Sequence, residues 1–267
     1  MNKRLFRTQF NQMENIEKQV LMESLAARYD MTFLGLHTFD RWGQSCTTGI
    51  FEKDGRKFVF VPGDTVTLGW EQFAVGLNQE SREELEYLFR EWEMEPQNPE
   101  EMIRESMAPV RQAAIGPMLV GRELEELCWE SVKMDDPRLT AHPDWLKEFR
   151  DFAWSDSSSL TLHQSARIER TEDGFQTWIY NRTDYDELLT GLEKQGLSLP
   201  TADEWAYLCG GGCQTLFPWG DGLDYSMRLR WFEDMDEDEN RSYDMEEPNF
   251  FGLSIAYDPY MREVVQA

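Results

Sequence analysis

The chain contains few of the residues on which disulfide and metal chemistry depend. Its 267 residues include only four cysteines and three histidines. Four cysteines in a chain of this length do not make the disulfide scaffold of a small secreted domain, and a reducing compartment is the simpler interpretation. We therefore expect the cysteines to be buried as small apolar residues: Cys46, Cys128, Cys209 and Cys213.

Basic residues are also scarce. Lys and Arg number 26 against 51 Asp and Glu, which gives a formal net charge of -25. Such a chain repels a phosphate backbone, so the sequence predicts neither a nucleic-acid partner nor an anionic membrane partner. Basic protein surfaces and divalent cations are compatible with this charge. We expect another protein as the partner.

Long apolar runs are missing as well. No run approaches the roughly 18 residues that span a bilayer, and no apolar segment of a signal peptide follows the basic residues 1–6. These two features predict a cytoplasmic protein. The length permits one large domain or two small ones, and we favour one domain with an N-terminal extension.

Several segments carry clear local signals. Apolar residues at helical spacing predict a helix within residues 11–29, and Asp54-Gly55 between two apolar runs predicts a β-hairpin over residues 51–68. Ser81 with Glu84 has the spacing of a capping box, and an apolar stripe follows it. That stripe predicts a helix over residues 81–93: its members are Leu85, Leu88, Phe89 and Trp92.

A second capping box begins a short helix near residue 201. Thr201 has the residue type and spacing to bond the backbone N–H of Glu204, whose carboxylate reaches back to the Thr201 N–H. Trp205 and Leu208 share one face of this helix, and the run Gly210–Gly212 ends it. Further along, Pro-Trp-Gly-Asp at residues 218–221 has the chemistry of a tight turn.

Three motifs in this order resemble the formylglycine-generating-enzyme, or sulfatase-modifying-factor, family. They are Leu-Pro-Thr-x-x-Glu-Trp at residues 199–205, Pro-Trp-Gly-Asp at residues 218–221 and Asn-x-Phe-Gly-Leu at residues 249–253. Segments 58–69 and 109–120 are similar to the family's opening strands. Ser198 stands where family members usually have Arg.

This resemblance covers residues 56–262 with insertions, and it implies an α+β, C-type-lectin-like fold. We expect an N-terminal helical extension over residues 1–48 and a family-like domain over residues 49–267. Within that domain we expect a helical insertion at about residues 75–105 and an acidic loop at residues 222–248.

The resemblance does not extend to the family's catalytic residues. Catalytic members are copper-dependent oxidases with two essential cysteines near a Gly-Phe-Arg-Cys segment, which this sequence lacks. The sequence stops where the family would only have reached its Gly-Asn-x-Trp-Glu-Trp strand. Iron-dependent members use a His-x-x-x-His-x-Glu array, whereas His37, His142 and His163 are far apart here. We expect no oxidase activity.

Two segments are candidates for binding a metal. Cys209 and Cys213 flank three glycines that let both thiols face one ion, but zinc requires four ligands, so a flexible turn with incidental cysteines is favoured. A second candidate is an acidic run with oxygen ligands at EF-hand spacing, for calcium. An acidic surface loop is the favoured alternative, because Arg241 stands where an EF-hand has Gly. The calcium candidates are Asp236, Asp238, Asn240, Asp244 and Glu247.

Our leading hypothesis is a non-catalytic cytoplasmic binding protein that uses the loops between Pro218 and Pro248. The alternative is a metal-dependent or thiol-dependent enzyme that uses Cys209 and Cys213 and is completed by a partner subunit. A third hypothesis is a subunit whose sheet edge is capped by another chain. Three tryptophans in polar contexts are candidate anchors for a partner: Trp42, Trp145 and Trp154.

Overall fold

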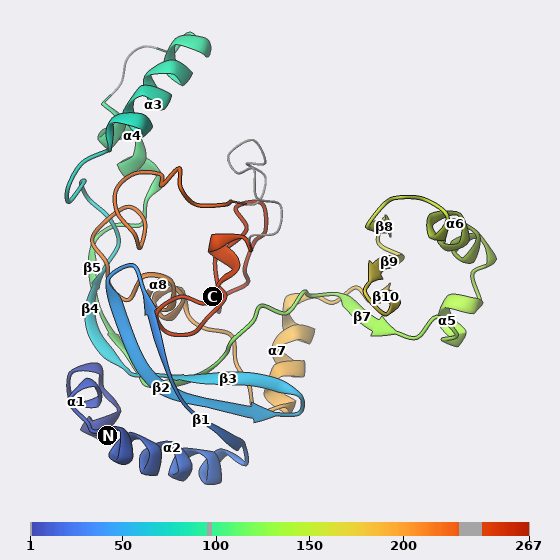
Figure 1. Ribbon diagram of the computed structural model, residues 1–267, viewed down its shortest axis with the longest axis horizontal. Coiled ribbons are helices and arrows are strands. Elements are labelled where there is room, and N and C mark those ends of the chain that lie inside the picture. The colour runs from blue at the N-terminus through green and yellow to red at the C-terminus, as the bar shows by residue number, and fades with distance from the viewer. Residues whose placement is uncertain (1, 95–97, 230–241, 267) are drawn as a thin grey trace. The chain divides into compact units, whose positions relative to one another are not determined.

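The computed structural model describes residues 2–94, 98–229 and 242–266 of the chain (Figure 1). It shows a mixed α+β protein in which every pair of named strands is antiparallel. The chain divides into two compact units. The first comprises Met1–Leu124 with Pro200–Ala267, and the second comprises Glu125–Leu199.

The first unit is built on a four-stranded sheet with the order β1-β2-β3-β6. The expected hairpin at Asp54-Gly55 is confirmed, since these two residues join β2 to β3 with φ values of 52° and 76°. Two more strands, β4 and β5, form a separate pair. The strands are β1 (Thr32–Arg41), β2 (Gln44–Lys53), β3 (Arg56–Val61), β4 (Asp64–Leu68), β5 (Arg111–Ile115) and β6 (Met118–Gly121).

Helices of the first unit come from both ends of its sequence. Figure 1 shows α2 lying along one side of β1 and β2. The helices are η1 (Lys3–Leu5), α1 (Arg7–Asn11), α2 (Asn15–Tyr29), α3 (Gln79–Glu91), α4 (Pro99–Ser106), α8 (Ala202–Gly210) and η3 (Asp244–Glu246). Among the described residues, no helix is long and apolar enough to cross a membrane.

The N-terminal segment is part of the core of this unit. The Phe10 ring is fully buried and packs against Phe60 at 5.1 Å between ring centroids. The backbone of Gly63 bonds both Leu5 and Arg7, at 3.1 and 2.8 Å. The segment that we expected to be a helical extension, residues 1–48, also contains β1 and the first part of β2. Its expected end lies inside a strand because the sheet continues across that position.

The buried face of α2 differs from its most apolar stripe. Lys18, Met22 and Leu25 face the core, whereas Ile16 and Val20 are 68% and 60% exposed. The Lys18 Nζ lies 4.7 Å from the Phe10 ring centroid and donates to the Thr47 carbonyl at 3.1 Å. Burial lowers the pKa of Lys18. A sequence pattern that only separates polar from apolar residues misses such a lysine, because the aliphatic stem of a lysine can be buried against apolar surface.

Helix α3 begins earlier than its sequence signal predicted. Asn78 is the N-cap, and its side chain accepts from the Ser81 N–H at 2.8 Å. The expected cap, Ser81, is instead buried inside the first turn, where its Oγ accepts from the Leu223 N–H at 3.0 Å. The prediction of Ser81 as the cap was wrong because Asn78 is an equally good cap one turn earlier.

The motif segments meet around α8. The capping box of Thr201 and Glu204 is confirmed, and Gly211 ends the helix with a φ of 62°. Asn249 is buried and crosslinks the core: its Nδ2 donates to the Leu208 carbonyl, while its Oδ1 accepts from the N–H groups of Phe251 and Leu253. One amide thus satisfies three backbone groups that the buried segment leaves without strand partners.

The second unit contains a four-stranded sheet with the order β7-β10-β9-β8. Its strands are β7 (Trp129–Val132), β8 (Ser159–Leu162), β9 (Ala166–Thr171) and β10 (Gly174–Tyr180). Its helices are α5 (Pro137–Thr140), α6 (Pro143–Ala153) and α7 (Tyr185–Lys194). The apolar core comprises Val132, Leu139, Phe149, Phe152, Ala166, Ile168 and Ile179.

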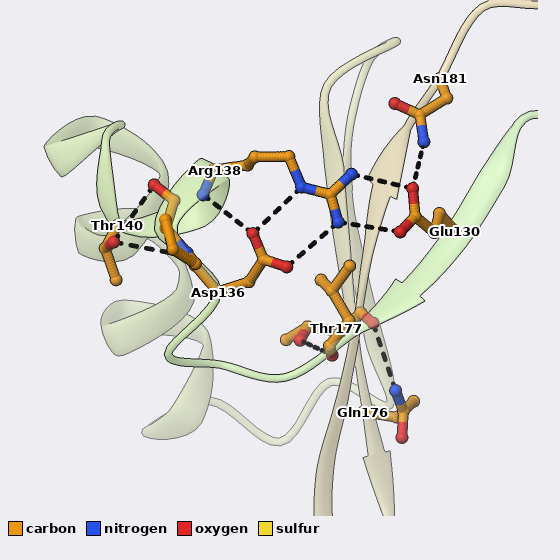
Figure 2. A network of polar contacts seen from close by, with 9 residues as sticks. Glu130, Asp136, Arg138, Thr140, Gln176, Thr177 and Asn181 are labelled. Carbon is orange, nitrogen blue, oxygen red and sulfur yellow. Dashed lines mark hydrogen bonds and ion pairs between the residues drawn. The ribbon is translucent and has the colours of Figure 1, made fainter.

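An exposed charge network fastens α5 to β7 in this unit. The Arg138 guanidinium donates two bonds of 2.8 Å to the Glu130 carboxylate and two of 3.1 Å to Asp136, as Figure 2 shows. Asn181 donates to the same Glu130 carboxylate at 2.6 Å. These bonds to Arg138 hold the pKa values of Glu130 and Asp136 below their usual range. The single guanidinium bonds both carboxylates and joins α5 to β7, so we assign the network a structural role.

Replacing the buried amide of Asn249 tests its importance for the fold. We expect Asn249→Ala to lower the free energy of unfolding by about 3 kcal/mol, because two buried N–H groups and one carbonyl lose a partner. Chemical denaturation followed by circular dichroism measures the change. Asn15→Ala, at an exposed position of α2, is the control and should cost under about 0.5 kcal/mol. Equal effects of the two substitutions would contradict this role.

Candidate functional site

The loop over residues 214–223 is held in place by a buried carboxylate. Asp221, the last residue of the Pro-Trp-Gly-Asp motif, is 3% exposed. Its Oδ2 accepts from the N–H groups of Val75 and Gly76 at 2.6 and 3.0 Å, and its Oδ1 accepts from the Leu216 N–H at 3.0 Å. The three backbone hydrogen bonds offset the free-energy cost of burying this charge. Asp221 therefore fixes its own loop and the loop that precedes α3.

The same motif orients two aromatic rings. Phe217 and Gly220 exchange backbone hydrogen bonds of 2.8 and 3.1 Å, which closes a tight turn. The Phe217 and Trp219 rings stack in parallel, with centroids 4.8 Å apart and an interplanar angle of 1°. The Trp219 indole N–H donates to the Gly222 carbonyl at 3.0 Å. Both rings are half-buried, so part of each faces solvent.

Trp42 occupies an unfavourable backbone conformation at the tip of the β1–β2 hairpin. Its φ is 52°, followed by 72° at Gly43, so two residues with positive φ make the turn. The neighbouring β2–β3 hairpin has similar φ values but uses Asp54-Gly55, a pair suited to this geometry. A bulky side chain with positive φ costs roughly 1–2 kcal/mol. The turn itself therefore gives no reason for Trp at this position.

Ring contacts explain what holds Trp42 there. Its ring lies 5.4 Å from the Trp219 ring and is tilted by 50° to it, and the Arg41 guanidinium lies 4.5 Å from the Trp42 ring centroid. Phe217, Trp219, Trp42 and Arg41 thus form a continuous series of contacting groups across two loops. We call these four residues the aromatic ladder. The Trp42 indole N–H makes no hydrogen bond to a described residue, and it is not among the buried unpartnered atoms of that part of the chain.

Arg41 connects the aromatic ladder to the segment before Pro248. Its guanidinium donates to the backbone carbonyls of Asp244, of Glu247 at 2.6 Å and of Pro248 at 3.4 Å. Burial lowers the pKa of Arg41, and the carboxylates of Asp244 and Glu247 oppose that shift. The guanidinium is therefore committed to fixing a backbone segment, which leaves its ring contact with Trp42 as a secondary role.

The base of the acidic loop is closed by hydrogen bonds. The Arg228 N–H donates to the Asp244 Oδ2 at 2.7 Å, and the Asp244 N–H donates to the Arg228 carbonyl at 2.8 Å. Glu247 accepts from the Ser242 hydroxyl at 2.7 Å. These two predicted calcium ligands already have protein partners. The other three, Asp236, Asp238 and Asn240, lie outside the described residues, so the calcium site stays a prediction.

The two thiols at the end of α8 are near enough to influence each other's ionisation, and both cysteines are half-buried. Cys213 Sγ lies 2.7 Å from where a Cβ on Gly210 would stand, so a larger residue at position 210 would displace the Cys213 side chain. Burial raises the pKa of Cys209, with further contributions from Glu263 and Cys213. Burial also raises the pKa of Cys213. Because the thiolate is the nucleophile and the metal ligand, these shifts weigh against reactive chemistry at neutral pH.

The remaining candidates are separate from one another. The His37 ring contacts Phe39, and His142 stacks on Trp145 at 3.8 Å between centroids. Trp145 packs against the core of the second unit, whereas Trp154 is 89% exposed. Within the ranges that the structure describes, no three His, Cys, Asp or Glu side chains come together in a group that could hold a metal ion.

Sequence reasoning selected Trp42 and Trp219 separately but did not bring them together. It missed Arg41 and Phe217. The Trp of Pro-Trp-Gly-Asp is most simply interpreted from sequence as a core residue, but the Trp219 ring is only half-buried. The signal that was available is Trp-Gly at a two-residue hairpin turn, where Asn-Gly or Asp-Gly is usual. Comparisons with protein-family models, with curated proteins and with solved structures find no match to this chain.

The thiols provide a first test of the site assignment. At pH 8 we expect iodoacetamide to modify half-exposed Cys128 first, with Cys46 lagging far behind because burial raises its pKa to about 11. Cys209 and Cys213 should lag as well, since fewer of their thiols are ionised. Mass spectrometry of timed samples measures the order. Rapid modification of Cys209 or Cys213 in the folded protein would contradict the assignment and favour thiol chemistry.

The strain at Trp42 provides a second test. Trp42→Asn relieves the backbone conformation but loses ring contacts of similar size, so we expect the free energy of unfolding to change by under about 1 kcal/mol. Trp219→Ala relieves no strain and should cost about 2 kcal/mol. Denaturant melts of both variants measure the difference. If Trp42→Asn costs as much as Trp219→Ala, the turn is not strained and Trp42 is an ordinary packing residue.

Proposed function

We propose that this protein is a non-catalytic binding protein that contacts a partner protein through the aromatic ladder and the loops between Pro218 and Pro248. The single observation that carries the proposal is Trp42, which has a positive φ at a turn whose backbone geometry suits Asn or Asp better. Residues kept in unfavourable backbone conformations cluster at functional sites. Tryptophan and arginine are also the residues most often found at the energetic centre of interfaces.

Rigid support of the loops favours the same proposal. Asp221 and Arg41 fix the backbone on either side of the ladder through bonds to N–H and carbonyl groups. A partner that binds such loops does not have to order them first, which spares part of the entropy cost of association. The ladder rings therefore have the features of a preorganised contact surface.

The alternative is an enzyme that uses Cys209 and Cys213. The influence of the two thiols on each other's ionisation supports it, since it places them near one another. The raised pKa of both thiols opposes it, and the Glu263 carboxylate contributes to that shift at Cys209, because a protonated thiol is a poor nucleophile and a poor metal ligand. A partner subunit that supplied a positive charge would have to reverse this shift.

We also propose that the chain has the fold of the family that its motifs resemble. Its three motifs act on one core: Thr201 begins α8, Asn249 bonds the Leu208 carbonyl in α8, and Asp221 anchors the intervening loop. Motifs that together determine one fold are expected to act on the same core in this way. We propose a C-type-lectin-like architecture of the formylglycine-generating-enzyme type, and a cytoplasmic location for the protein.

Quantitative affinity capture from an extract of the source cells tests the proposed function. We expect the full-length chain to recover a specific partner, and we expect Trp219→Ala and Trp42→Asn to reduce its recovery at least about tenfold, since hot-spot truncations often cost 2 kcal/mol or more. Trp154→Ala is the matched control, because this ring is also exposed but lies outside the ladder.

Two results would contradict the proposal. Either no partner is recovered specifically by the wild-type chain, or the ladder variants and Trp154→Ala recover it equally. Thermal melts of each variant show whether a loss of recovery reflects unfolding, and Trp42→Asn is informative here because its expected effect on stability is small.

A further inference from the structure

Helix α3 carries an apolar stripe that the rest of the protein covers only in part. Ser81, Leu85, Leu88 and Trp92 are separated by four, three and four residues, the spacing of a coiled-coil seam. Ser81 is buried and Leu85 and Leu88 are half-buried, whereas Trp92 is 66% exposed. Phe89, beside Leu88, is buried as well, so the stripe is open to solvent chiefly at Trp92, just after the last residue of the helix.

The short helix that follows does not supply the missing cover. On α4, the apolar residues Met102 and Ile103 are themselves only half-buried, and α4 has no fully buried residue. Its fixed contacts are with the segment before α3: Glu100 accepts from the Phe73 N–H at 3.1 Å, and Arg104 donates to the Glu71 carbonyl at 2.7 Å. Neither contact lies on the α3 stripe.

Glutamates border this stripe. Residues 79–93 contain six glutamates and two arginines. Glu80 and Glu84 are four residues apart on one side of α3, where like charges destabilise a helix. In the heptad that places Leu85 and Leu88 on the seam, Glu84 and Glu91 occupy positions that flank it. Neither of these two carboxylates makes an ion pair with a described residue, and both are exposed.

These charges distinguish between two occupants of the stripe. Arg82 and Phe89 occupy the opposite flank of the stripe. A second copy packed antiparallel would therefore bring its own glutamates against Glu84 and Glu91, and like charges across a helical interface are repulsive. A partner helix with lysine or arginine beside its apolar stripe would instead pair with them. The apolar anchor Trp92 and the acidic flanks are both complementary to such a helix.

We propose that α3 is a docking surface for an amphipathic helix of a partner protein, with basic residues flanking its apolar stripe. Trp92, Leu88 and Leu85 provide the apolar contact, and Glu84 and Glu91 select the basic flanks. This interaction uses α3 and is separate from the one proposed for the aromatic ladder, so either can fail without the other.

Two synthetic four-heptad peptides test the proposal on the full-length chain. Both have Leu at the seam positions, and the flanking positions are Lys in one peptide and Glu in the other. We expect the wild-type chain to bind the Lys peptide in fluorescence anisotropy and not the Glu peptide. Glu84→Lys with Glu91→Lys should weaken Lys-peptide binding at least about tenfold and create binding of the Glu peptide. Trp92→Ala should weaken binding of the Lys peptide.

The control is a double variant with the same change in net charge at exposed helical positions of the second unit, Glu148→Lys with Glu193→Lys. It should bind the Lys peptide as the wild type does. The proposal is overturned if this control weakens binding as much as the α3 variant, because attraction to an acidic chain would then explain the result. It is also overturned if the wild type binds neither peptide.

Sedimentation velocity tests whether a second copy of the chain covers the α3 stripe instead. If the wild-type chain self-associates and Trp92→Glu abolishes that association, a second copy covers the stripe and the proposed partner is wrong. Far-UV circular dichroism of every variant establishes that α3 is still folded when binding is lost.

Discussion

The first unit depends on one buried amide, that of Asn249. Its three hydrogen bonds tie the segment 249–253 to α8, and the surrounding rings of Tyr207, Phe250 and Phe251 are almost fully buried. The backbone N–H and carbonyl groups of a buried segment that lies outside a sheet need such hydrogen bonds from side chains, because an unpaired buried backbone group costs about as much as a lost hydrogen bond. The segment 249–253 and α8 are consequently held as one framework.

A framework fixed by buried polar anchors allows its loops to carry unfavourable features. The hydrogen bonds of the Asp221 and Arg41 side chains across the loops all go to backbone groups, and these bonds set the loop positions. Trp42 can therefore remain in a conformation that an isolated hairpin would avoid. We propose that the half-buried rings contact another molecule.

Local signals in the sequence were reliable where one or two residues determine the local backbone conformation. The Thr201 capping box and the Asp54-Gly55 turn are examples, since both depend on neighbours within a few residues. Signals that depend on distant packing were less reliable. Lys18 is buried although it is charged, and Ser81 lies inside a helix it was expected to cap, because Phe10 and Leu223 determine their surroundings. The aromatic ladder joins residues about 175 positions apart, which no local pattern reveals.

The central claim is that the loops around the aromatic ladder are rigid in the unbound protein. Native-state hydrogen exchange tests it at the three N–H groups that bond Asp221, those of Val75, Gly76 and Leu216. We expect these three N–H groups to exchange nearly as slowly as those of the central strand β3, since opening of the loops must break bonds to a buried charge. Exchange at the rate of an open loop would show that these loops are not preorganised, and would contradict the account.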